Sequence, residues 1–345
     1  MIKLHFTRTN NTADEAIDSL IGLVGDVNHP DLVREMILAA LKAGQERNNR
    51  ADLKLMNTTM KEMRFTSKTF APYRHKRKVT VFGSARTKPD EPIYAMAHAF
   101  GKRLADEGYM VITGAGGGIM HAANEGAGSE HSFGVNIQLP FEQKPNPVLL
   151  GNPRLITYKY FFNRKVAFLK EADAVALFPG GFGTLDEAME TLTLLQNGKH
   201  SPIPLVLIEE PNGGTYWARL IKFFTEELLA DGYISEGDFH LFELVHSIDE
   251  AVESINQFYS RYHSIRYVNE KLVVRLSKDL SQGDVERLNK DFSDILAPGG
   301  RIALSGALPE ESDEPEIMEL PRLLVDFNLI AFGRLRTLIE AINRS

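Results

Sequence analysis

Short apolar runs alternate with longer helix-periodic segments through the middle of the chain, from Lys78 to about Tyr262. Runs that are apolar throughout, such as AVALF and PLVLI, predict strands buried on both faces of a parallel sheet. Strands that alternate with helices of this length predict βαβ units, and therefore a doubly wound, Rossmann-like α/β domain. We expect strands within residues 78–84, 109–118, 132–140, 155–161, 172–178 and 202–210, and helices over 93–107, 163–171, 185–196 and 216–229 and from residue 119.

The two ends of the chain have different patterns. Residues 1–75 are mostly polar, and HPDLVREMILAALKAG places apolar residues at helical spacing behind an N-cap expected at Asp31. We expect a helical arm there, which packs on the main domain or on a second subunit. Residues 263–345 suggest a small α+β appendage of βαββα order. The predicted domains are therefore 1–75, 76–262 and 263–345.

The composition limits the classes of partner and of chemistry. The 345 residues carry a formal net charge of −7, so no basic excess exists to neutralise nucleic acid or an anionic membrane. A basic run, RHKRK at residues 74–78, is expected to be a linker or a solvated face. The absence of cysteine excludes disulfides, thiolate metal sites and cysteine nucleophiles. With no leader-like or membrane-length apolar run, we expect a cytoplasmic protein without nucleic-acid or membrane partners.

Glycine-rich loops follow three of the predicted strands: FGSART at 82–87, TGAGGGIM at 113–120 and PGGFGT at 179–184. A glycine loop that leads into a helix offers backbone N–H groups and the positive end of the helix dipole, and both favour a phosphate. The dinucleotide fingerprint G-x-G-x-x-G and the P-loop signature are both absent. Glycines at TGAGGG could also serve only as tight turns between strand and helix.

The stretch PGGFGTLDE carries the strongest signal. Glu187 follows Thr184 by three residues, so both are predicted on the first turn of the next helix, facing one ligand. A glutamate there could instead only complement the helix dipole. The histidines show no metal-ligand spacing, so we expect neither a metal nor another cofactor.

PGGFGTLDE resembles the PGGxGTxxE signature of the LOG family, the cytokinin-activating phosphoribohydrolases and their bacterial relatives, the nucleoside 5′-monophosphate nucleosidases. The family's second mark, an Arg-Lys pair, stands here as Arg164 and Lys165, and the resemblance spans roughly residues 78–230. Such sequences often carry the label lysine decarboxylase, but no motif here indicates the Schiff-base lysine that pyridoxal phosphate requires.

The resemblance implies hydrolysis of the N-glycosidic bond of a nucleoside 5′-monophosphate, with a purine nucleotide or a cytokinin riboside monophosphate as substrate. Glu187 and Arg164 are then the catalytic residues, and the role of Arg164, on the phosphate or on the departing base, stays open. The resemblance also implies a homodimer or a higher homo-oligomer. The residues expected to bind phosphate and ribose are Gly180, Gly181, Gly183, Thr184, Ser84, Gly116, Gly117, Gly118 and Lys165.

A non-catalytic nucleotide sensor on the same fold is the alternative hypothesis. Glycine loops suffice for binding, whereas a sensor has no need for both Arg164 and Glu187. Because the chain carries both, the sequence favours the enzyme.

Overall fold

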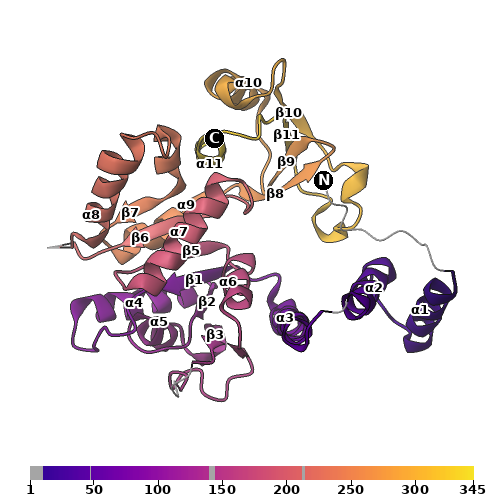
Figure 1. Cartoon of the computed structure of the whole chain (residues 1–345). Helices are drawn as coiled ribbons and strands as arrows, with labels where there is room; N and C mark the ends of the chain where they lie inside the picture. The colour runs from indigo at the N-terminus through magenta and orange to yellow at the C-terminus, as the bar shows by residue number, and fades with distance from the viewer. Residues whose placement is uncertain (1–10, 47, 140–143, 212–213) are drawn as a thin grey trace. The chain divides into compact units, whose positions relative to one another are not determined.

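The computed structural model describes residues 11–46, 48–139, 144–211 and 214–345, and it divides into two compact units, residues 1–64 and 65–345 (Figure 1). The described part of the first unit consists of α1 (Asn11–Val24), α2 (Pro30–Gln45) and most of α3 (Arg50–Phe70). A buried ion pair between Arg34 and Asp14 joins α1 to α2. The N-cap predicted at Asp31 is wrong, because α2 already begins at Pro30, where the missing proline N–H costs nothing.

The second unit contains a seven-stranded sheet in the order β4-β3-β2-β1-β5-β6-β7, and every neighbouring pair is parallel. The strand order reverses between β1 and β5, so a ligand site is expected where their carboxyl ends meet. The predicted doubly wound, Rossmann-like fold is confirmed. Its elements are β1 (Lys78–Phe82), α4 (Pro92–Asp106), β2 (Met110–Thr113), α5 (Ile119–Ala127), β3 (Ser132–Ile137), β4 (Leu155–Tyr158), α6 (Phe161–Lys170), β5 (Ala174–Leu177), α7 (Phe182–Gln196), β6 (Leu205–Ile208), α8 (Tyr216–Phe223), β7 (Glu243–Val245) and α9 (Ile248–Phe258).

Helices cover both faces of this sheet. On one face, α4, α5 and α9 pack on alternate residues of the central strands, such as Val79 and Val81 of β1. The intervening residues of β1 contact α6 on the other face: Thr80 Oγ1 donates to the Phe168 carbonyl at 3.0 Å, and the Phe82 and Phe168 rings meet edge to face at 4.8 Å. Because successive residues of β1 face opposite helix layers, both faces of the strand are buried, as its apolar sequence predicted.

Two elements of this domain were absent from the sequence prediction. β7 has only three residues and its first two are partly exposed, so its hydrophobic signal is weak. α9 carried a clear signal, because Ser247 caps it by accepting from the Glu250 N–H, and apolar residues recur along one face.

The basic run at residues 74–78 is not simply a solvated face. Arg77 lies over the Tyr259 ring at 3.5 Å and pairs with Asp173 at 3.3 Å. Lys78 is buried in β1, and its ammonium donates to the carbonyls of Tyr73 and Lys76. The expectation is therefore wrong for the last two residues of the run, which fix β1 to its surroundings.

The C-terminal part forms a second, antiparallel sheet in the order β10-β11-β9-β8. The predicted βαββα order lacks its first strand, β8, which joins β9 through a tight turn at Asn269 and Glu270, both with positive φ. Polar residues interrupt β8, so its pattern resembles a loop. The elements are β8 (Tyr262–Val268), β9 (Lys271–Leu276), α10 (Gln282–Asp291), β10 (Ile302–Ser305), β11 (Arg322–Val325) and α11 (Phe332–Asn343).

A buried ion cluster anchors the acidic loop of this part. Glu311 is fully buried, and its carboxylate lies 2.7 Å from Arg275 of β9 and 3.4 Å from Arg322 of β11. Both arginines are themselves buried, so each charge depends on the others. Among the described helices, none combines the length and the apolar character needed to cross a membrane.

Candidate active site

The loop between β5 and α7 is held from two sides through consecutive carbonyl groups. The Ser84 N–H, from the loop after β1, donates to the Pro179 carbonyl at 3.0 Å. The Tyr216 hydroxyl, from the start of α8, donates to the Gly180 carbonyl at 2.7 Å. With both carbonyls fixed, the chain enters α7 in a single orientation, with Gly181 as its N-cap.

The glycines of this loop have two different functions. A Cβ atom on Gly180 would lie 2.1 Å from the Thr184 hydroxyl, so only glycine fits between the loop and the helix. A Cβ atom on Gly181 or Gly183 would meet nothing within 4 Å. These two positions border open space above the N-terminus of α7, where the helix dipole favours an anion.

The open space is a cavity of about 750 Å³ at the point where the strand order reverses. Its size suits a small organic ligand. The structure brings most of the predicted site residues together on its walls: Ser84, Arg164, Gly180, Gly181, Gly183, Thr184 and Glu187. The other residues on its walls are Phe82, Gly83, Ala85, Arg86, Gly114, Met120, Phe168, Phe182, Leu185 and Tyr216.

The second glycine loop contributes its two ends, Gly114 and Met120, to the cavity walls, and its middle supports the neighbouring loop. Gly116, Gly117 and Gly118 are not among the residues on its walls. The Ile119 N–H donates to the Ser84 carbonyl at 3.0 Å, and a Cβ atom on Gly118 would lie 2.1 Å from that carbonyl oxygen. Gly118 thus allows this loop to approach the loop after β1, which itself holds the Pro179 carbonyl.

Glu187 is the buried carboxylate of the cavity, with 3% of its surface exposed. α7 begins at Phe182, two residues earlier than Thr184, so Glu187 lies on the second turn and the first-turn prediction is wrong. It therefore does not serve as a first-turn partner of the helix dipole, although the i, i+3 spacing still places it on the face of Thr184. No group among the described residues donates a hydrogen bond to Glu187 Oε2.

Burial raises the pKa of Glu187 from its ordinary value near 4.5 to about 7, against the attraction of Lys165 and Arg164. The Lys165 ammonium lies 3.5 Å from Oε2, within ion-pair range. Near neutral pH this carboxyl is then divided between its acid and its carboxylate form. Such a group can both give and take a proton at working pH.

Arg164 and Lys165, adjacent on α6, are placed in different surroundings. Arg164 lies on the cavity wall, over the rings of Phe161 at 4.8 Å and Phe168 at 5.4 Å. Its Nε has no hydrogen-bond partner among the described residues, and burial lowers the pKa of its guanidinium. It is a partly desolvated cation in the same cavity as Glu187.

Lys165 points instead to three carboxylates of α7. Its ammonium lies 2.5 Å from Glu190 and 3.0 Å from Asp186, in addition to its ion pair with Glu187. Burial lowers the pKa of Lys165, but the bonds to Glu190 and Asp186 outweigh it, and the net pKa is raised. Lys165 does not line the cavity of about 750 Å³.

Tyr216, Met120 and Arg86 line the cavity but were not predicted from the sequence. Tyr216 follows a further glycine-bearing strand end, PNGGTY after β6, and that repetition was the available signal. The described residues contain no group of three or more histidine, aspartate or glutamate side chains placed to hold a metal ion.

Part of the chain is similar to proteins of known families. Residues 118–255 match a family model described as "Possible lysine decarboxylase". The chain is 25% identical over 169 residues to a cytokinin riboside 5′-monophosphate phosphoribohydrolase of Arabidopsis thaliana, covering 48% of this chain and 76% of that protein. It is 28% identical over 148 residues to a pyrimidine/purine nucleotide 5′-monophosphate nucleosidase of Escherichia coli K12, covering 40% of this chain and 33% of that protein.

Among solved structures, a molybdenum cofactor carrier protein of Chlamydomonas reinhardtii matches with 22% identity and a TM-score of 0.36, covering 53% of this chain and 97% of that one. The phosphoribohydrolase and nucleosidase matches support the resemblance that the PGGFGTLDE stretch indicated.

Proposed function

Because the chain is a relative of the LOG-type phosphoribohydrolases and nucleotide nucleosidases, we propose that it hydrolyses the N-glycosidic bond of a nucleoside 5′-monophosphate. Water attacks the ribose C1′ atom, the C1′–N bond breaks, and the products are the free base and ribose 5-phosphate. The observation that carries the proposal is Glu187, a buried carboxylate beside the open N-terminus of α7 whose Oε2 accepts no hydrogen bond from the described residues.

The N-terminus of α7 is the part of the cavity suited to the 5′-phosphate. Gly181 and Gly183 leave room for a close approach, and the Thr184 side chain lies beside them. Arg86 adds a positive charge to the same cavity. Backbone N–H groups, the helix dipole and an arginine together form an ordinary phosphate site.

Glu187 is suited to the reacting end of the substrate. The transition state of glycosidic hydrolysis carries positive charge on the sugar, which the carboxylate form of Glu187 stabilises. A carboxyl group with a pKa of about 7 also accepts the proton of the attacking water.

Arg164 supplies a partly buried cation to the cavity, and the two roles left open for it predict different kinetics. If Arg164 binds the phosphate, Arg164→Met raises KM and changes kcat little. If it stabilises the departing base, the same change lowers kcat with little effect on KM.

The experiment is a panel of AMP, GMP, IMP, CMP, UMP and isopentenyladenosine monophosphate, with chromatography of the free base. Wild-type protein is compared with Glu187→Gln, which keeps the shape of the side chain and removes its charge. The proposal requires base release by the wild type and a loss of at least a hundredfold in the variant. Nucleotide binding without base release from any member of the panel would instead support the sensor.

A further inference from the structure

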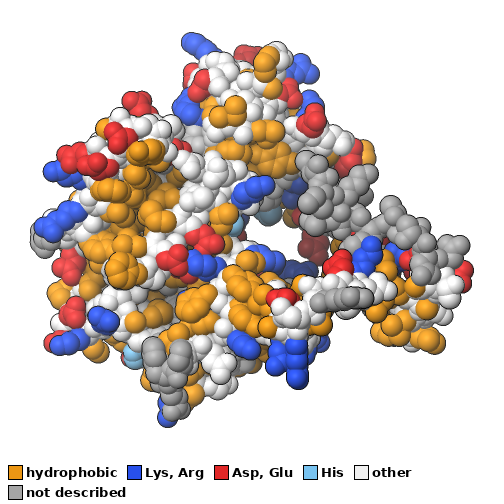
Figure 2. Space-filling model, viewed as in Figure 1, with side chains coloured by type: hydrophobic (Ala, Val, Ile, Leu, Met, Phe, Trp, Pro, Cys, Tyr) orange, Lys and Arg blue, Asp and Glu red, His pale blue; other side chains and the backbone are white. Residues whose placement is uncertain are grey.

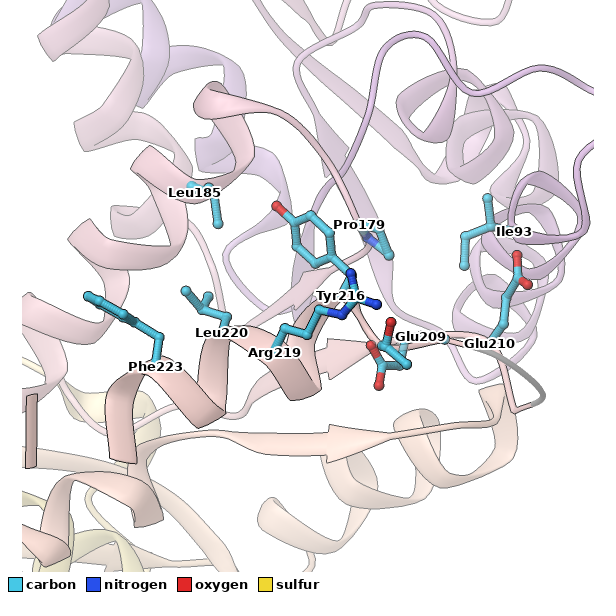
Figure 3. Close-up of a pocket in the computed structure, with 11 residues that line it drawn as sticks. Ile93, Pro179, Leu185, Glu209, Glu210, Tyr216, Arg219, Leu220 and Phe223 are labelled. Carbon is cyan, nitrogen blue, oxygen red and sulfur yellow. The ribbon is translucent and has the colours of Figure 1, made fainter. Parts of the chain in front are cut away.

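A second cavity, of about 630 Å³, lies on the other side of the phosphate-binding loop. Pro179 lines it, and Leu185 and Tyr216 line both this cavity and the candidate active site. Figure 3 shows its two unlike ends: Leu185, Leu220 and Phe223 lie at one, and Glu209 and Glu210 lie toward the other, near Ile93. The proposed nucleotide hydrolysis assigns no role to the residues at either end.

Glu209 is a carboxylate whose surroundings leave one oxygen without a donor. It follows β6 directly and is fully buried. Its Oε2 accepts the Trp217 N–H at 2.9 Å, which fixes the side chain against the start of α8. Its Oε1 has no hydrogen-bond partner among the described residues. A buried carboxylate oxygen without a donor is costly, so the position favours a ligand that brings an N–H group.

The charges around Glu209 favour a cation. Glu210 is a second carboxylate on the same wall. Arg219 reaches toward the middle of the cavity beside Tyr216 (Figure 3), and its side chain is exposed. Two carboxylates against one exposed arginine leave this end negative.

The opposite end favours an apolar body. Leu220 and Phe223 belong to α8, and half of the surface of Phe223 is exposed. Figure 2 shows hydrophobic side chains gathered over α8, the region to which this end of the cavity belongs. A ligand that covers these side chains gains about 25 cal/mol for each Å² of apolar surface that it removes from water.

We propose that this cavity binds an amphipathic primary amine, with its ammonium group on Glu209 Oε1 and its apolar body against Leu220 and Phe223. The site is separate from the nucleotide site, because the loop of Pro179 and Gly180 lies between the two cavities. The occupant contacts Pro179 and Tyr216, the residues through which the phosphate-binding loop is held.

The test is isothermal titration calorimetry of the full chain with hexylammonium chloride as the probe and hexanol as its uncharged match. Wild-type protein should bind hexylammonium at one saturable site, at least tenfold more tightly than hexanol. Glu209→Gln should weaken hexylammonium binding at least tenfold, while Glu253→Gln, an exposed carboxylate on α9 outside this cavity, should leave it unchanged.

Phe223→Ser serves as a second variant, because the exposed position of Phe223 does not endanger folding. It should weaken hexylammonium binding severalfold through loss of the apolar end. The proposal would be overturned if hexanol bound as tightly as hexylammonium, or if Glu209→Gln left hexylammonium binding unchanged. Loss of hexylammonium binding in the presence of saturating AMP would also overturn it.

Discussion

Replacing Glu187 with glutamine should stabilise the protein, and the gain should depend on pH. The folded protein raises the pKa of this carboxyl from near 4.5 to about 7, so it holds the proton more tightly than the unfolded chain does. Below pH 4.5 the group is protonated in both the folded and the unfolded state, so its ionisation does not affect the free energy of unfolding. As pH rises toward 7 the unfolded chain releases the proton while the folded protein keeps it, and the wild type loses stability.

The magnitude follows from the two pKa values. Each pKa unit corresponds to about 1.4 kcal/mol, so burial of the ionised carboxylate costs the wild type roughly 3 kcal/mol above pH 7. Glutamine does not titrate and carries no such cost. The free energy of unfolding of Glu187→Gln relative to the wild type should therefore rise by up to about 3 kcal/mol between pH 5 and pH 8.

Urea unfolding of both proteins at pH 5, 6, 7 and 8 measures this difference. Glu253→Gln is the control, because Glu253 is an exposed carboxylate on α9 that does not line the cavity of Glu187. The control should differ from the wild type by a small amount that stays constant over this range. A constant difference for Glu187→Gln as well would refute the reasoning, since it would mean that burial does not raise the pKa of Glu187.

Three further predictions concern the loop and the appendage. Tyr216→Phe removes the hydrogen bond to Gly180, worth about 1 kcal/mol, so the Kd for AMP should rise roughly fivefold in calorimetry. Gly180→Ala forces a methyl group to within 2.1 Å of a hydroxyl and should abolish AMP binding, whereas Gly181→Ala, with no atom within 4 Å, should keep the loop conformation in its crystal structure. Glu311→Gln removes the carboxylate shared by two buried arginines, of which Arg275 keeps its ion pair with Glu314, and should lower the free energy of unfolding by about 3 kcal/mol. Asp313→Asn, which removes an exposed partner of Arg266, should change the free energy of unfolding far less in urea unfolding.

The parallel sheet could be predicted because its central strands are buried on both faces. Val79 to Phe82 and Ala174 to Leu177 are apolar at almost every position, and such short runs, alternating with helical segments, are typical of buried parallel strands. The strand β8 could not be predicted in this way, since most of its residues are only partly buried and its polar residues lack the alternation of an edge strand.

Only part of the candidate site could likewise be predicted from the sequence. The glycines and Glu187 share one loop and one helix, so their proximity follows from the local sequence. The pairing of Lys165 with carboxylates of α7 depends on how two helices pack, and the bond from Tyr216 to Gly180 joins segments 36 residues apart. No local pattern encodes either contact. The expected homo-oligomer stays a prediction.

The central claim is that the protein breaks the bond between base and ribose, and the products from AMP test it most directly. Wild-type protein would be incubated with AMP in water enriched in ¹⁸O, and adenine, ribose 5-phosphate, adenosine and inorganic phosphate would be quantified by mass spectrometry. The account predicts adenine and ribose 5-phosphate in equal amounts, with the heavy oxygen on C1 of the sugar. Adenosine with labelled phosphate, or no turnover of any nucleotide, would contradict it.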